Sequence, residues 1–336
     1  MLKQRSNRIT VLIALVILIV AQLFMFASVS LSTNRDPVTI LVRHGTGLWN
    51  IANRLRIEGI INSSSLFVLS SLAYRGKLMA GEYDLRRNMS IIDIVKKMGR
   101  GDRNIYTLKI LEGHNIYNIA DAIEKARIMA GSEFLHLAQD SSFLARLGIK
   151  GDSLEGYLAP DTYYYSKEVD KDTLIEGIVK KTFKNFAKED IKKRMSELNL
   201  DTHMVLTLAS IIEREAKAKE EKPLMAAVFL NRLKLGMRLE ADPTVTYGTR
   251  AFNEPIRKID LTTYTPYNTY TFSGLPKGPI CNPDRNSIRA VLYPASADYL
   301  FFVSRNDGTH VFSKNMEEHS RFVTMYQRAK NAKTNK

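Results

Sequence analysis

Hydrophobic residues follow three different patterns along the chain. Residues 9–31 read ITVLIALVILIVAQLFMFASVSL and contain no charged side chain. From residue 37 onward, apolar positions alternate as in strands or recur every three to four residues as in helices. Residues 241–285 depart from both periods and are rich in Asn, Tyr and turn-forming residues. These patterns predict an α+β protein with a long functional loop region behind an apolar N-terminal segment.

The apolar segment is long enough to cross a membrane. Its 23 residues would form a helix of ~35 Å, which exceeds the hydrocarbon core of a bilayer. Lys3, Arg5 and Arg8 precede it, so the N-terminus should be cytoplasmic and the rest extracytoplasmic. A cleaved signal peptide is the alternative, but its apolar region is usually shorter. We therefore expect a retained single transmembrane helix in the inner membrane.

A strand–turn–helix pattern occurs twice. TILVRHGTGLWNIANRL begins at Thr39 and TLKILEGHNIYNIADAI begins at Thr107, with matching residues 68 positions apart and a glycine, Gly45 or Gly113, in each turn. The constant offset predicts a duplicated unit in which the Ile-Ala pair of each helix is buried.

The other segments read as ordinary strands and helices. We expect a strand around Gly81, a helix that Ser90 caps and that ends at Gly99, mainly helices over 121–200, a helix over 205–219 and a strand at YLFFVS.

Charge and cysteine content exclude several function classes. The net charge is +14, but the two chain ends carry eight of these charges and no nucleic-acid motif is present, so we expect no nucleic-acid partner. Cys281 is the only cysteine, which excludes an intramolecular disulfide and a Cys-based metal cluster. His310 and His319 lack zincin spacing. We expect neither a metal nor a cofactor.

Two glutamates follow an apolar run in LTLASIIEREAKAK, residues 206–219. On a helix, Glu213 would lie among small side chains and could pair with Lys217, while Glu215 could pair with Lys219. Both can be solvated charges at a helix end. Alternatively, one is a half-buried carboxyl whose pKa is raised by desolvation, as a general acid requires. Spacing alone does not separate these interpretations.

The loop region supplies groups that suit sugar binding beside a catalytic carboxyl. Each of them can also be explained by a turn or a core position. The candidates are Asp242, Thr244, Tyr247, Tyr267, Asn268, Tyr270 and Asn282, with Glu155 as a weaker one.

Several blocks of sequence together resemble the endolytic murein transglycosylase family, also called MltG or YceG-like. They are LEGYLAPDTY, LASIIERE, FLNRL, LEADPTVTYG, YNTY, GLPKGPICNP and THVFSKNMEEH, in this order. The resemblance implies the following parts: a cytoplasmic tail (1–8), a transmembrane helix (9–31), a LysM-like subdomain (37–105), an α+β catalytic domain (106–325) and a basic tail (326–336).

The resemblance also implies the chemistry. Glu213 aligns with the family's catalytic glutamate, which cleaves the bond between N-acetylmuramic acid and N-acetylglucosamine in nascent peptidoglycan and leaves 1,6-anhydro ends, terminating strand elongation. Peptidoglycan strands and peptidoglycan synthases are the implied partners. For sugar binding beside Glu213 we expect six of the loop candidates named above, namely Asp242, Thr244, Tyr247, Asn268, Tyr270 and Asn282. Two alternatives stay open: a non-catalytic wall-binding scaffold, and a two-carboxylate hydrolase with Asp242 or Glu215 as the second acid.

Overall fold

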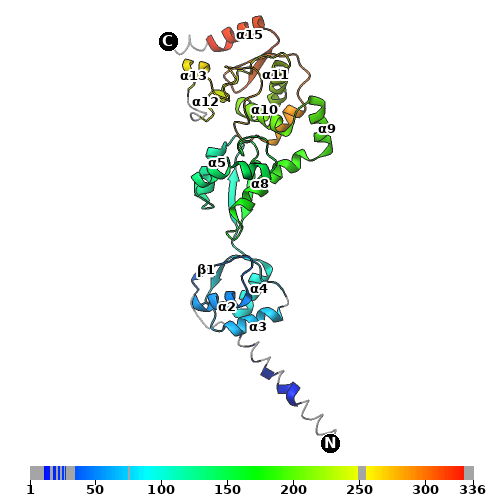
Figure 1. Cartoon of the computed structure of the whole chain (residues 1–336). Coiled ribbons are helices and arrows are strands. Elements are labelled where there is room, and N and C mark those ends of the chain that lie inside the picture. Colours follow the sequence, from blue (N-terminus) through cyan, green and yellow to red (C-terminus); the bar gives the residue numbers. More distant parts are fainter. Residues whose placement is uncertain are drawn as a thin grey trace. The chain divides into compact units, whose positions relative to one another are not determined.

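The chain forms two compact units of mixed α and β structure (Figure 1). The computed structural model describes residues 11–15, 18–19, 22, 25, 27, 35–74, 76–248 and 255–328. Unit 1 comprises Met1–Tyr106 and Tyr164–Asp170, and unit 2 comprises Thr107–Tyr163 and Lys171–Lys336. The predicted α+β class is confirmed. Within these described ranges, no helix is both long and apolar enough to span a bilayer, and the predicted membrane segment 9–31 lies largely outside them.

Unit 1 is built on an antiparallel pair of strands. Strand β1 (Pro37–Val42) pairs with β2 (Gly81–Arg86), so that Val42 lies opposite Gly81. Helices α2 (Leu48–Ile57) and α3 (Ser64–Ala73) connect the strands, and α4 (Ile91–Arg100) follows. Apolar side chains from all five elements form one core.

Helix α4 begins as predicted, because the Ser90 hydroxyl accepts a hydrogen bond from the Asp93 amide at 3.2 Å. It continues one residue beyond the predicted end at Gly99. Gly101 adopts a left-handed conformation with φ 73° and closes the helix there.

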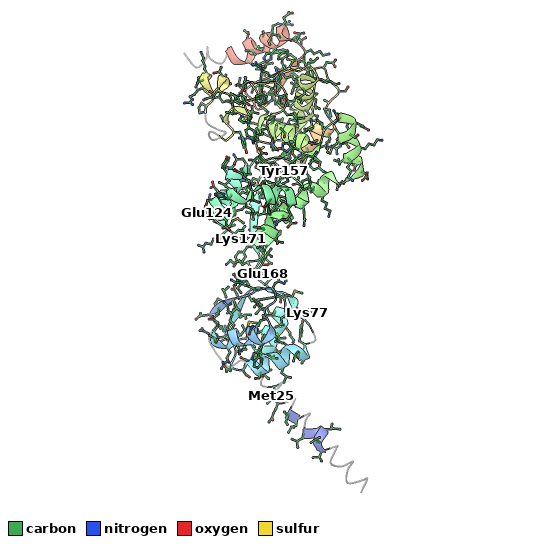
Figure 2. The ribbon with its side chains drawn as sticks, viewed as in Figure 1. Met25, Lys77, Glu124, Tyr157, Glu168 and Lys171 are labelled. Atoms are coloured by element: carbon green, nitrogen blue, oxygen red, sulfur yellow. The ribbon has the colours of Figure 1, made fainter. Side chains whose placement is uncertain are left out.

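A segment distant in sequence completes unit 1. In Tyr164–Asp170, the Glu168 carboxylate (labelled in Figure 2) is buried and pairs with Arg103 at 2.5 Å. Lys167 of the same segment pairs with Glu82 of β2 at 3.1 Å. Buried charges need partners, and these two ion pairs attach the segment to the unit. The sequence pattern did not predict that Tyr164–Asp170 belongs to unit 1.

The predicted duplication of a strand, a glycine turn and a helix is confirmed. Strand β3 (Tyr106–Ile110) ends 68 positions after β1 ends, and helix α5 (Ile116–Lys125) begins and ends 68 positions after α2 does; only the start of β3 differs, by one residue. Gly45 and Gly113 have nearly the same positive φ, 79° and 74°. The Ile-Ala pair is buried in both helices, as predicted.

Unit 2 is mainly helical. Beside β3 and α5 it contains, in chain order, α6 (Gly131–Leu137), α7 (Ser141–Arg146), β4 (Asp161–Tyr165), α8 (Lys171–Phe186), α9 (Glu189–Leu198), α10 (Thr202–Glu215), η1 (Lys219–Glu221), α11 (Lys222–Lys234), α12 (Pro243–Thr246), α13 (Lys258–Thr262), α14 (Arg285–Leu292), β5 (Phe301–Ser304), β6 (His310–Ser313), α15 (Met316–Val323) and η2 (Thr324–Arg328). Strand β4 pairs with β3, and β5 pairs with β6. Helices α10, α11 and α14 pack on one another.

A buried Glu–Asn pair fixes the second glycine turn within unit 2. The Asn282 amide nitrogen donates to the His114 carbonyl at 2.9 Å and to Glu155 Oε1 at 3.1 Å. Glu155, only 1% exposed, accepts two further hydrogen bonds at Oε2, from the Ile116 amide at 3.0 Å and the Tyr247 hydroxyl at 2.8 Å. Four segments distant in sequence are thereby held in one arrangement.

Replacing Glu155 with Gln should flatten the pH dependence of unfolding. Burial raises the pKa of Glu155 from 4.5 to about 7, although its hydrogen bonds oppose this shift. Between these two pH values the unfolded chain has released the proton while the folded chain keeps it. The contribution of this carboxyl to the free energy of unfolding therefore falls as pH rises through that window. Glu155→Gln does not titrate, so its unfolding free energy should lack this decline.

Glu155→Gln should also lose about 1–3 kcal/mol of stability, because one of the two oxygens that accept hydrogen bonds is replaced by an NH2 group, which donates. Urea unfolding between pH 5 and pH 8 measures both effects. Glu189→Gln, which changes an exposed carboxylate on α9, is the control and should follow wild type. If the unfolding free energy of Glu155→Gln and of wild type changed equally with pH, the raised pKa could not belong to Glu155.

Candidate active site

Three helix ends meet around Glu213. The residue lies in the last turn of α10, whose positions 205–212 are all buried. Lys222 is the first residue of α11, and Asp284 is the N-cap of α14, where its carboxylate accepts the Ser287 amide at 2.6 Å. An aspartate three residues before a serine is a usual helix start. Because α10 packs on both other helices, their N-terminal ends lie at its C-terminal end.

Glu213 is held through one carboxylate oxygen. Its Oε2 accepts hydrogen bonds from Lys222 Nζ at 3.0 Å, Ser287 Oγ at 2.5 Å and the Asp284 amide at 3.1 Å. Oε1 accepts no hydrogen bond from any residue in the described part of the chain. The Glu213 side chain is 10% exposed, so its carboxylate is fixed in position yet reachable from solvent.

The charges at this site are compensated by Lys222. Its ammonium, 5% exposed, lies 3.0 Å from both Glu213 Oε2 and Asp284 Oδ1. Burial alone would lower the pKa of Lys222, but hydrogen bonds and charge attraction to the two carboxylates outweigh burial and raise it. Burial likewise opposes ionisation of Asp284, yet the Ser287 amide and Lys222 hold the pKa of Asp284 at about 2.

The second glycine turn forms one wall of the site. Oxygens of Glu112, Glu213 and Asp284 lie within 4.8 Å of one another. A Cβ on Gly113 would lie 3.4 Å from Arg214 Nη1 and 3.9 Å from Glu213 Cγ. Together with its positive φ, this close approach explains why a glycine occupies the position.

The ion pairs expected from sequence spacing differ from those in the structure. Glu213 pairs with Lys222, not with Lys217. Helix α10 ends at Glu215 instead of residue 219, because Ala216 adopts an extended conformation. Lys217 and Lys219 therefore lie beyond the helix and outside its i to i+4 spacing.

The carboxyl with a pKa raised by burial, which was expected at one of the two glutamates, is Glu215. Burial, and then the charge of Asp242, raise the pKa of Glu215 to about 8. Asp242 is exposed and accepts a hydrogen bond from the Tyr270 hydroxyl at 2.6 Å. Among the candidate sugar-binding residues, Asp242 and Tyr270 are therefore brought together, near the glutamate that lies two residues beyond Glu213.

The other four candidates are buried and bind the protein itself. Thr244 and Asn268 have no exposed surface; the first bonds to Thr269 and the second to the carbonyls of Asp260 and Thr263. Asn282 and Tyr247 both bind Glu155. Direct sugar contact was predicted for all four. The structure differs, because their polar atoms already shape the loops around the site.

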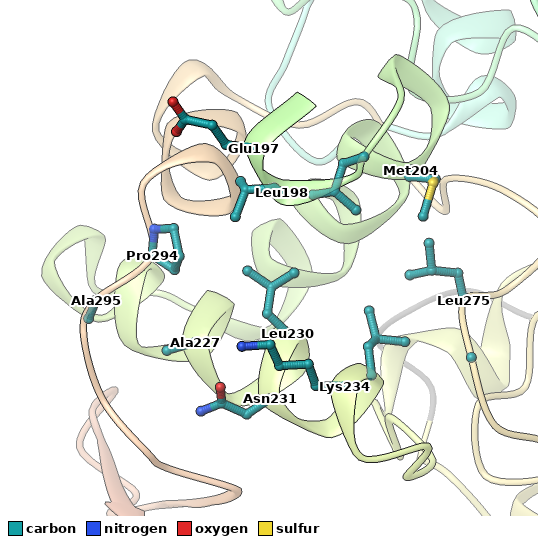
Figure 3. A pocket seen from close by; sticks show the side chains of 13 residues that line it. Glu197, Leu198, Met204, Ala227, Leu230, Asn231, Lys234, Leu275, Pro294 and Ala295 are labelled. Carbon is teal, nitrogen blue, oxygen red and sulfur yellow. The ribbon is translucent and has the colours of Figure 1, made fainter. Parts of the chain in front are cut away.

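Two hollows lie near α10. A polar one of about 450 Å³ is lined by Glu112 and Asp284, the neighbours of Glu213, and by Asp161, Lys181 and Arg285. An apolar one of about 670 Å³ lies at the opposite end of α10, where it is lined by Met204, Leu230 and Leu275 (Figure 3). The polar hollow is the one whose lining includes neighbours of the Glu213 carboxylate, Glu112 and Asp284.

Sequence reasoning missed four residues of the site: Glu112, Lys222, Asp284 and Ser287. The spacing of Asp284 and Ser287 was a detectable helix start, and Pro223 marked the start of α11. Lys222 was indistinguishable from the neighbouring lysines, since only the tertiary fold brings it to Glu213. Cys281 is buried and donates to the Ser210 carbonyl at 3.3 Å.

Replacing Lys222 with Met should destabilise unit 2 by about 3–5 kcal/mol, because two buried carboxylates lose their common cation. The double variant Lys222→Met/Asp284→Asn should recover more than half of that loss, since one carboxylate is removed with the ammonium. Urea unfolding of the two variants and wild type measures this coupling. A double variant less stable than Lys222→Met alone would show that charge compensation is not the role of Lys222.

Comparison with known proteins identifies the family. A model of the YceG-like family matches residues 40–325. An endolytic murein transglycosylase from Bacillus subtilis is 32% identical over 319 residues, which cover 89% of this chain and 88% of that protein. One from Streptococcus pneumoniae is 26% identical and is covered over 60% of its length. The crystal structure of a YceG-like protein from Listeria monocytogenes matches with a TM-score of 0.60 and 33% identity, over 86% of this chain and 99% of that one. The chain therefore belongs to the YceG-like family.

Proposed function

We propose that this protein is an endolytic murein transglycosylase, which cuts peptidoglycan strands internally and so terminates their elongation. The name of the Bacillus subtilis relative, matched over nearly its whole length, supports the activity. One observation carries the assignment to a residue: Glu213 is fixed through Oε2 by three donors, while Oε1 accepts no hydrogen bond within the described ranges. A carboxyl held in this way can transfer a proton through its second oxygen.

In the first step, Glu213 acts as a general acid. Its protonated Oε1 gives the proton to the oxygen that links N-acetylmuramic acid to N-acetylglucosamine, and the bond from that oxygen to muramic C1 breaks. The negative charge that forms on Glu213 is stabilised by Lys222, Ser287 and the Asp284 amide, whose donors are already in place.

In the second step, the same glutamate acts as a base. It takes the proton of the C6 hydroxyl of the muramic residue, and O6 attacks C1 to close a 1,6-anhydro ring. Glu213 is thereby protonated again, by the proton of the C6 hydroxyl, while the proton it gave away stays on the N-acetylglucosamine that leaves; no water is consumed. A single carboxyl therefore serves in both steps, in contrast to the two carboxyls of most glycosidases.

Exposed aromatic side chains at equivalent places of the duplicated unit suit sugar binding. Trp49 is 52% exposed and Tyr117, 68 positions later, is 43% exposed. Rings of this kind offer apolar faces against which sugars pack. The β1–α2–α3–β2 order of unit 1 supports the LysM-like assignment, so we assign glycan contacts to both copies, with Asp242 and Tyr270 as further contacts.

Anchoring in the inner membrane is part of the proposal. Its support is the uncharged stretch at 9–31 with a basic N-terminus. In the proposed topology the catalytic unit lies outside the cytoplasm, near newly made strands and their synthases. Protease added to intact spheroplasts should digest unit 2 in a full-length chain tagged at its N-terminus. Protection of unit 2 from the protease would overturn this topology.

A hydrolase is the second candidate, because Glu112 supplies another carboxylate close to Glu213. The carboxyls of retaining glycosidases are typically only ~5 Å apart. In this reading Glu112 or its bound water attacks C1, and the products carry reducing ends. The earlier candidates for a second acid, Asp242 and Glu215, interact with each other instead.

Mass spectrometry of sacculi treated with the full-length protein separates these functions. Wild type should release 1,6-anhydro ends, and Glu213→Gln should lower the rate by at least ~10²-fold. Glu112→Gln should retain the anhydro product. Reducing ends that disappear in Glu112→Gln would favour the hydrolase. Binding without cleavage by wild type and Glu213→Gln alike would favour a scaffold.

A further inference from the structure

The proposed reaction requires a space for peptide directly beside Glu213. Each muramic residue carries its stem peptide on a lactyl group at C3, two ring carbons from the C1 at which the bond breaks. A strand can be cut at an interior muramic residue only if that peptide has a path away from the reacting ring. The peptide is anionic, because its D-glutamate and its C-terminal residue carry carboxyl groups.

A groove that starts at the site supplies such a path. The polar hollow beside Glu213 adjoins a second one of about 280 Å³, and the two share Asn185, Arg285 and Ile288 as lining residues. We call the two hollows together the Arg285 groove. Its near end contains Asp284, whose amide donates to Glu213. The groove therefore runs from residues that contact Glu213 to the surface between α8, α9 and α14.

Charge is unevenly distributed along the Arg285 groove. Lys181 pairs with Asp161 and Asp284 pairs with Lys222, so these charges are compensated. Arg285 and Arg289 are one turn apart on α14 and exposed, and neither forms a salt bridge with another residue in the described part of the chain. The Arg289 guanidinium lies 5.5 Å from the Tyr293 ring centre, beside the lining residue Leu292. The far end, which Lys188 and Asp190 also line, thus has two more cationic groups than its one carboxylate and offers both guanidinium groups beside apolar surface.

We infer that the Arg285 groove binds the stem peptide of the muramic residue being cleaved, with Arg285 and Arg289 recognising its carboxylates. This inference rests on the proposed function. Guanidinium groups bind carboxylates through paired hydrogen bonds, which an ammonium reproduces poorly. The alanine methyl groups of the peptide contact Ile288 and Leu292. Glu112 at the near end repels carboxylates and directs them to the arginines.

Two forms of one substrate test the inference. Glycan strands with intact peptides are compared with strands from which an N-acetylmuramoyl-L-alanine amidase has removed them. Wild type should cleave the peptide-bearing strands with the higher kcat/KM. Arg285→Gln and Arg289→Gln should each lower kcat/KM on peptide-bearing strands by roughly tenfold, the effect of losing one charge-assisted contact, and should leave cleavage of bare strands unchanged.

Two further variants make the result specific. Arg285→Lys keeps the charge without the paired donors and should give an intermediate kcat/KM on peptide-bearing strands. Arg321→Gln removes another exposed arginine, on α15, and should behave as wild type on both substrates. Circular dichroism of each variant confirms that it folds.

The outcomes distinguish the inference from the proposed function. If wild type cuts neither substrate, the proposed function fails and the groove has no role in it. If wild type cuts both and the Gln variants lose activity equally on both, the groove binds sugar and the inference is wrong. It is also wrong if the Gln variants match wild type on peptide-bearing strands.

Discussion

The ammonium of Lys222 between Glu213 and Asp284 is the contact on which the site depends. The two carboxylates come from different helices and have oxygens within 4.8 Å of each other, a distance at which like charges repel strongly once water is excluded. Lys222 contributes a third helix end and converts the repulsion into two ion pairs. The N-terminal ends of α11 and α14 favour negative charge, whereas the C-terminal end of α10 opposes it. The ammonium offsets that opposing dipole.

The duplicated unit shows how one local structure serves two purposes. In unit 1, Gly45 turns the chain where an added Cβ would meet no atom within 4 Å. In unit 2, the same turn at Gly113 lies against Arg214 and Glu213, and the residue before it is Glu112, where the first copy has His44. The φ angle is nearly the same in both copies. The turn is therefore a property of the repeat, while the carboxylate and the close approach belong to the site.

Local structure could be predicted from the sequence because local interactions determine it. The 68-residue repeat, the Ser90 cap and the helical stretch before Glu213 all depend on neighbours within a few positions. The end of α10 was misplaced by four residues, since the extended conformation of Ala216 has no signature in its residue type. Lys222 could not be identified at all, because its role arises only when α11 packs on α10.

The roles of the polar residues in the loop region could not be predicted for a related reason: they too depend on the tertiary fold. Asn and Thr suit sugar binding and loop stabilisation equally well, and only burial separates the two roles. Asn282 and Asn268 proved to be internal partners, each bonding to backbone carbonyls. Asp242 and Tyr270 keep exposed surface. A residue type typical of binding sites therefore indicates a site only when its polar atoms are not already used by the fold.

The three glutamates around the site differ in what surrounds the carboxyl, and this difference determines what each can do. Glu155 is enclosed and has only hydrogen-bond donors as partners, so burial raises its pKa and it can hold loops together but cannot reach a substrate. The pKa of Glu215 is raised further, by burial and by the charge of Asp242. Glu213 alone combines a buried cation with an accessible second oxygen. A residue that must both give and take a proton needs its anion stabilised as well as its acid, and Lys222 provides that stabilisation at Glu213.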